Sequence, residues 1–104
     1  MADLPARSEF EAQVNSDFVV VAGQDKRLQM RLVGVEDGYS TPENEQFALH
    51  FHVPAEMPPH QGTYHVEHAA LGPMDVFLVP VAQEGDTLVL EAVFNRFVDA
   101  EKEN

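Results

Sequence analysis

Apolar and polar residues alternate along much of this chain, a pattern that predicts strands with one buried face. The alternation is clearest in residues 45–53. One face of this expected strand carries Phe47, Leu49, Phe51 and Val53. The opposite face carries His50 and His52, so the strand is predicted to be half-buried with its histidines outside.

Five other stretches alternate in the same way or are dense in Val, Leu and Phe. Together the pattern predicts strands at 17–23, 27–36, 45–53, 61–68, 74–81 and 87–96. The last two flank a short polar turn at Gly85, which is typical of an antiparallel hairpin. Both faces of residues 76–81 are apolar, so this strand is expected to need cover on each side. The predicted fold class is all-β, a small antiparallel barrel or a strongly curved six-stranded sheet.

Residues 5–15 are predicted to form the single helix, a short one at the N-terminal side of the sheet. Ser8 and Glu11 have the spacing of a capping box, and Phe10 and Val14 share one helical face. Because so short a helix is marginal alone, Phe10 is expected to hold it on the sheet as a lid over one end of the core. The acidic tail at 98–104 is expected to be frayed.

The length of 104 residues predicts a single domain over 1–104 with one modest core. The chain has no Cys, which excludes a disulfide framework, a thiolate zinc site and a cysteine nucleophile. The N-terminal residues lack a secretory signal, and no apolar stretch is long enough to span a bilayer. These features predict a soluble protein of the cytoplasm.

The charge is strongly acidic, with 18 Asp and Glu against 6 Lys and Arg and a net charge of −12. All five histidines lie between Arg31 and Arg96, a window without any Lys or other Arg. Such a chain repels nucleic-acid phosphates and anionic membranes, so neither is an expected partner. A protein partner with a basic surface is the favoured kind, and the alternative is that the charge serves solubility alone.

Several short strings of the chain occur together in one known family. They are 61–64 (QGTY), His68, 71–72 (LG), 77–80 (FLVP) and 91–96 (EAVFNR), with Phe47, Leu49 and Phe51 upstream. By these strings the chain resembles an uncharacterised bacterial family, a domain of unknown function. The resemblance implies a stand-alone domain without an assigned activity, in an accessory or structural role beside phage-tail-like proteins. His50 and His52 depart from the family's pattern, so the resemblance implies no chemistry for them.

A metal site is one candidate for chemistry. His50, His52 and the following Glu56 resemble the first metal motif of cupins, in which two such histidines reach one ion. If 45–53 and 61–68 form a hairpin, His65 is a third ligand for a divalent transition metal. The second cupin motif and the glycine before the first histidine are absent. The alternatives are solvent-facing histidines and a pH sensor built from the histidine-rich window.

A second candidate site lies at the start of the predicted strand 61–68. His60, Gln61 and Tyr64 form a possible binding surface in a loop presented by Pro58 and Pro59; the alternative is that Gly62 only begins a strand.

Arg96 is expected to form a structural ion pair with Glu91, Glu67 or Asp75, because a buried charge needs a partner. The alternative is that Arg96 clamps the carboxylate of a ligand.

No nucleophile elbow or phosphate-binding glycine loop occurs in the chain. The sequence therefore predicts a non-enzymatic binding or assembly module without a cofactor. The alternative is a metal-dependent, cupin-like activity through His50, His52 and His65.

Overall fold

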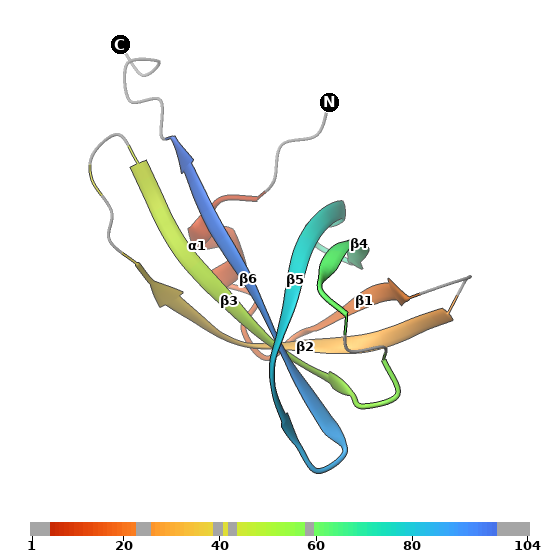
Figure 1. The fold of residues 1–104 in the computed structure, drawn as a ribbon. Coiled ribbons are helices and arrows are strands. Elements are labelled where there is room, and N and C mark those ends of the chain that lie inside the picture. The colour runs from red at the N-terminus through yellow and green to blue at the C-terminus, as the bar shows by residue number, and fades with distance from the viewer. Residues whose placement is uncertain (1–4, 23–25, 39–40, 42–43, 58–59, 98–104) are drawn as a thin grey trace.

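The computed structural model describes residues 5–22, 26–38, 41, 44–57 and 60–97, with the backbone alone at Arg96 and Phe97. Six antiparallel strands close into a barrel in the order β1-β2-β3-β6-β5-β4 (Figure 1). The elements are α1 (Arg7–Glu11), β1 (Asp17–Ala22), β2 (Lys26–Asp37), β3 (Asn44–Pro54), β4 (Gly62–His68), β5 (Gly72–Glu84) and β6 (Thr87–Phe97). The predicted fold class, a small all-β antiparallel barrel with a short N-terminal helix, is confirmed.

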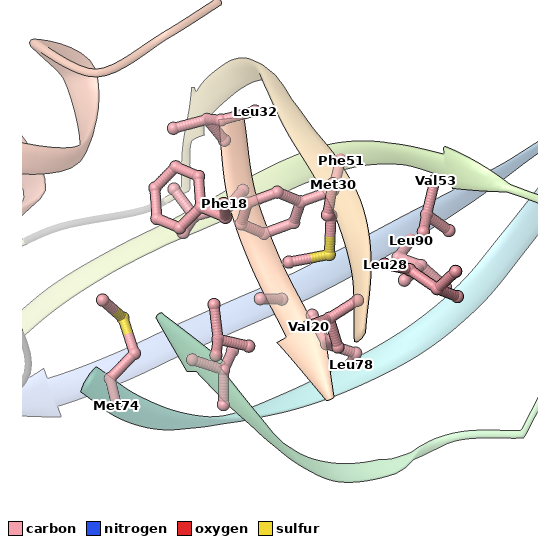
Figure 2. Packing of buried hydrophobic residues seen from close by; sticks show 14 of the residues in the cluster. Phe18, Val20, Leu28, Met30, Leu32, Phe51, Val53, Met74, Leu78 and Leu90 are labelled. Atoms are coloured by element: carbon pink, nitrogen blue, oxygen red, sulfur yellow. The ribbon is translucent and has the colours of Figure 1, made fainter. Parts of the chain in front are cut away.

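The interior of the barrel is filled by the apolar face of every strand. The buried side chains form one cluster: Phe10, Phe18, Val20, Ala22, Leu28, Met30, Leu32, Phe47, Leu49, Phe51, Val53, Met57, Val66, Met74, Val76, Leu78, Leu88, Leu90, Ala92 and Phe94. Figure 2 shows part of this cluster, with Phe18 and Phe51 packed edge to face at 5.4 Å. Burial of each such side chain contributes roughly 1.5–3 kcal/mol, so the core accounts for the apolar face of the alternation.

Strand β3 lies between β2 and β6, whereas β4 lies between β1 and β5. The hairpin between 45–53 and 61–68, on which His65 as a third metal ligand depended, is therefore not formed. Both edges of β3 are occupied, because β3 pairs with β6 from Asn44 to Pro54 on one side and with β2 on the other. The chain after Pro54 instead crosses to the far side of the barrel, where β4 completes the closure against β1.

Helix α1 is shorter than the expected 5–15. It spans Arg7–Glu11, and Ala6 is its N-cap, with the Glu9 carboxylate accepting a hydrogen bond from the Ala6 N–H at 2.7 Å. Ser8 lies inside the helix, so the capping box expected at Ser8 and Glu11 is wrong. The chain leaves the helix through turns that end at Asn15, whose φ of 77° is incompatible with a continuing right-handed helix.

The lid role of α1 rests on Phe10, which has 0% of its surface exposed. Its ring lies 5.4 Å from that of Phe94 and 6.2 Å from that of Phe47, on the inner face of β3 and β6. Phe47 and Phe94 are themselves stacked at 4.8 Å. The helix therefore closes the end of the barrel where β2, β3 and β6 extend past the other strands (Figure 1).

Strand β5 is covered on its inner face only. Val76 and Leu78 are buried, whereas Phe77 is 51% exposed on the outer face. The expected cover on both sides of 76–81 is therefore wrong, although the barrel is right. Strand β5 also changes partner along its length: residues 72–78 pair with β4, and the pairing with β6 begins at Val79. Above that point β5 and β6 diverge (Figure 1).

Candidate functional site

The packed interior of the barrel leaves the outer surface as the place for a functional site. Every buried side-chain nitrogen and oxygen in the described part of the chain has a hydrogen-bond partner. These residues therefore include no unsatisfied buried polar side chain that could bind a ligand inside the barrel. The same part of the chain contains no helix with the length and apolar character needed to cross a membrane.

A groove of about 340 Å³ lies where β2, β3 and β6 run side by side beyond the rest of the barrel. It is lined by Glu36, Asp37, Gly38, Gln46, Phe47, Ala48, Val93 and Asn95. The sheet register places Glu36 beside Ala48 and Ala48 beside Val93. Because the central Ala48 is small, the outer face is hollow between a carboxylate on one side and an apolar side chain on the other. We call this site the β2–β3–β6 groove.

The two long sides of the groove differ in chemistry. Val93 is 64% exposed, the most exposed large apolar side chain of the described residues. On the opposite side, Asp37 is held by an ion pair with Arg7, which also bonds Glu11 at 2.7 Å. The hydrogen bonds that Arg7 donates, chiefly the one to Asp37 and then the one to Glu11, raise the pKa of Arg7. Glu36 is exposed to solvent and is the carboxylate that a cationic ligand in the groove would meet.

His50 lies one row further along the same outer face. Its Nε2 is 3.0 Å from Glu91 Oε2 on β6, and both side chains are about three-tenths exposed or less. His52 lies two residues further on, where the register sets it between Arg31 and Val89. The two histidines therefore share one face of β3, as predicted, and His50 is already hydrogen-bonded to a carboxylate.

His65 lies on the other side of the barrel, on β4. Its Nδ1 is 3.3 Å from Asp75 Oδ1 and its Nε2 is 3.0 Å from Glu67 Oε2. Both carboxylates accept hydrogen bonds from the protonated ring, and these bonds, first the one to Asp75 and then the one to Glu67, raise the pKa of His65. Glu67 is also paired with Arg27, and the two hydrogen bonds, chiefly from Arg27, lower the pKa of Glu67. This cluster is exposed to water, so it is a surface network of charges.

The three histidines proposed as metal ligands do not converge. His50 and His52 are on β3, His65 is on β4, and these strands are not neighbours in the barrel. Across the described ranges, no group of three His, Cys, Asp or Glu side chains is arranged to hold a metal ion. A metal held by His50, His52 and His65 together would need the hairpin that this topology does not contain.

His68 is the one buried polar residue of the described part of the chain, with 9% of its surface exposed. Its Nδ1 accepts hydrogen bonds from the backbone N–H groups of Ala70 at 3.0 Å and Leu71 at 3.2 Å. The proton is therefore assigned to Nε2, which donates to Ser16 Oγ at 2.9 Å. Burial lowers the pKa of His68, so the ring is a neutral structural link between the start of β1 and the β4–β5 turn.

The binding surface predicted at His60, Gln61 and Tyr64 lies at the start of β4. The Tyr64 hydroxyl donates to the His60 carbonyl at 2.6 Å, and the Tyr64 ring packs against the core. His60 and Gln61 are exposed just before β4. Tyr64 thus ties His60 to the barrel wall, while the side chains of His60 and Gln61 face solvent.

The ion pair expected for Arg96 concerns a side chain outside the described part of the structure. The backbone of Arg96 pairs with Glu45 of β3. Of the three carboxylates expected as its partners, Glu91 is beside His50, and Glu67 and Asp75 are beside His65.

Sequence reasoning missed the β2–β3–β6 groove and with it Glu36 and Val93. One signal was present: Val93 interrupts the alternation of 87–96, because it is apolar on the face opposite Ala92 and Phe94. A second was the small Ala48 on the outer face of 45–53. Neither signal shows that the two positions are neighbours, which depends on the pairing of β3 with β6.

Comparisons with known proteins bear on the family and leave the activity open. No curated protein and no solved structure matches the chain. A family model does match, and it spans residues 5–94, which include α1 and nearly all of the barrel. The chain therefore belongs to the family described as Domain of unknown function (DUF6916).

Proposed function

We propose that this protein is a non-catalytic binding module that holds a basic segment of a partner protein in the β2–β3–β6 groove. The observation that supports the proposal is that the exposed Val93 and the carboxylate of Glu36 lie on opposite sides of the small Ala48 in the groove. An apolar contact and a carboxylate on opposite sides of a groove suit a Lys or Arg side chain, whose apolar stem and charged end differ in the same way.

The charge distribution supports the same kind of partner. The net charge is −12, and between Arg31 and Arg96 the sequence has no Lys or other Arg. A field of this sign attracts basic surfaces and speeds their association. The accessory role beside phage-tail-like proteins, implied by the resemblance, would make the partner a subunit of a large assembly.

A charge-reversal pair tests the proposal. Glu36→Lys places a cation in the groove, whereas Glu84→Lys makes the same change in charge at the β5–β6 turn, beside Thr87 and distant from Val93 along β6. Each variant is used to capture proteins from its native extract, beside the wild type. We expect one basic protein to be captured by the wild type and by Glu84→Lys, and to be reduced at least about tenfold with Glu36→Lys.

The result that contradicts the proposal is equal capture by the two variants, or the absence of any basic protein that the wild type retains. A Val93→Ser variant provides a second measurement, because it removes apolar contact without adding charge. It is expected to weaken capture without the salt sensitivity of the Glu36 change.

The alternative, a metal-dependent activity, is tested separately by adding metal ions to the protein. Protein purified without an affinity tag should show no thermal shift with zinc, nickel or iron, because His65 is not beside His50 and His52. Differential scanning fluorimetry with and without each metal measures this. A saturable stabilisation that disappears in His50→Ala and His65→Ala alike would restore the metal hypothesis.

A further inference from the structure

We propose that the partner segment binds as an extended strand along the edge of β6 at Val93 and Asn95, which we call the open β6 edge. This inference rests on the proposed function and adds how the segment is held: by backbone hydrogen bonds to β6, with its side chains beside Val93.

The direction of the β6 backbone groups follows from one hydrogen bond at the end of the β3–β6 ladder. The Ala55 N–H donates to the Asp86 carbonyl at 2.8 Å, one position beyond the pair Pro54 and Thr87. In an antiparallel ladder, bonded and non-bonded pairs alternate. Pro54, which has no N–H, therefore occupies a non-bonded pair, as its chemistry requires.

The β3–β6 register continues without interruption to Phe97, so the alternation continues with it. The backbone groups of Ala92 and Phe94 point to β3, whereas the N–H and C=O of Val93 and Asn95 point away from it. Glu91, which points the same way as Val93, is the last β6 residue that pairs with β5, opposite Val79. Beyond Glu91, β6 has no second partner strand among the described residues.

The cause of the open β6 edge is the change of partner in β5. Residues 72–78 of β5 leave β6 and pair with β4 to close the barrel. Helix α1 does not replace them as a partner, because Phe10 packs on the inner face of β6 against Phe94. Within the described ranges, β6 therefore has an inner face covered by α1 and, beyond Glu91, one edge that pairs with no other strand.

Strands β5 and β6 each carry an exposed apolar side chain in the part where they no longer pair with each other. Val93 is 64% exposed on β6 and Phe77 is 51% exposed on β5. Isolated edges of natural sheets are usually protected by charge or proline. The open β6 edge has Val93 and Asn95 in place of such protection, a composition that suits a bound strand.

The charge around the edge selects the occupant. Glu91 lies at the start of the open edge, Asp75 is exposed on β5, and Glu36 lies across the groove. A second copy of this chain would bring another net charge of −12 to the same place. The occupant is therefore an extended segment of a different protein, in which basic residues alternate with apolar ones.

A synthetic peptide of about ten residues, alternating Arg and Val, is the probe for this mode of binding. Its affinity is measured by calorimetry against the wild type, Asn95→Pro and Asn95→Ala. Proline at position 95 removes an N–H that points away from β3, so the β3–β6 ladder remains and the variant should fold. Alanine removes the same side chain and keeps the N–H.

We expect the wild type and Asn95→Ala to bind the peptide with similar affinity, and Asn95→Pro to bind at least about tenfold more weakly. In the wild type, amide hydrogen exchange at Val93 and Asn95 should slow by a similar factor when the peptide binds. This exchange measurement keeps the test valid if Asn95→Pro fails to fold.

Equal binding by Asn95→Pro and Asn95→Ala, with unchanged amide exchange, overturns strand addition. This result does not affect the proposed binding in the groove, which is tested by comparing Glu36→Lys with Glu84→Lys. A wild type that does not bind the peptide also overturns strand addition. Concentration-dependent dimers that Asn95→Pro abolishes would show that a second copy of the chain occupies the edge, which contradicts the proposed partner.

Discussion

His68 and His65 have opposite effects on the stability of the fold at acid pH, because burial lowers the pKa of one and carboxylates raise the pKa of the other. His68 is buried and neutral, with Nδ1 accepting hydrogen bonds from two backbone N–H groups. Its pKa in the folded protein is lowered from the ordinary value of 6.5. The unfolded chain therefore takes up a proton first, and the free energy of unfolding falls as the pH drops below about 6.5.

His65 has the reverse effect. Asp75 and Glu67 raise its pKa above the ordinary value of 6.5. The folded protein holds the proton more tightly than the unfolded chain, so this contribution to stability is complete below about pH 6.5 and is lost as the pH rises through the folded pKa. Because His65 is exposed, the contribution is expected to be small and sensitive to salt.

Replacement of each histidine by glutamine separates the two effects. In urea unfolding between about pH 5 and 8, His68→Gln should lose the decline in stability that the wild type shows toward acid. His65→Gln should be less stable than the wild type at the acidic end and nearly equal at the basic end. Parallel pH profiles for the wild type and His68→Gln would contradict the assigned role of the buried ring.

Among the elements, α1 depends most on a single side chain. A helix of five residues is unstable alone, and Phe10 anchors it on Phe47 and Phe94. Phe10→Ala is expected to lower the free energy of unfolding by about 3–5 kcal/mol, because it leaves a cavity under the helix. Equilibrium unfolding in urea measures the change.

Ser8→Ala is the control on the same helix. Ser8 is exposed and is not the N-cap, so its replacement should change stability by less than about 0.5 kcal/mol. A large loss at Ser8 would restore the capping box expected from the sequence. A small loss at Phe10 would show that the lid contributes little to the barrel.

For the molecule as a whole, the excess of negative charge opposes folding. The net charge of −12 produces self-repulsion, and the surface ion pairs Lys26–Glu56, Arg27–Glu67 and Arg31–Asp17 are formed by largely exposed side chains. Raising sodium chloride from roughly 0.02 to 0.5 M should therefore raise the Tm, because screening weakens long-range repulsion more than it weakens these pairs. Thermal unfolding followed by circular dichroism tests this, and a Tm that falls with salt would show that the ion pairs dominate.

The strand positions and the composition of the core followed from local pattern. The alternation in 45–53 placed Phe47 and Phe51 inside and His50 outside, because one residue along a strand reverses the face. The end of α1 was harder to predict, since it depends on the positive φ of Asn15 as well as on helix spacing. The prediction that Phe77 would be covered was wrong, because the apolar character of a strand residue does not show whether another layer packs against that face.

An all-β domain with a packed apolar interior and an acidic exterior can be predicted from the amino-acid sequence, because these properties depend on alternation, turn residues and charge. The identity of neighbouring strands cannot be predicted in this way and is known from the folded chain. The pairing of β3 with β6 separates His50 from His65, brings Val93 beside Ala48, and leaves the open β6 edge where β5 turns to β4. Alternative strand orders have similar local energies, because they differ only in which distant segments pair. The strand order is therefore selected by the packing of the whole barrel.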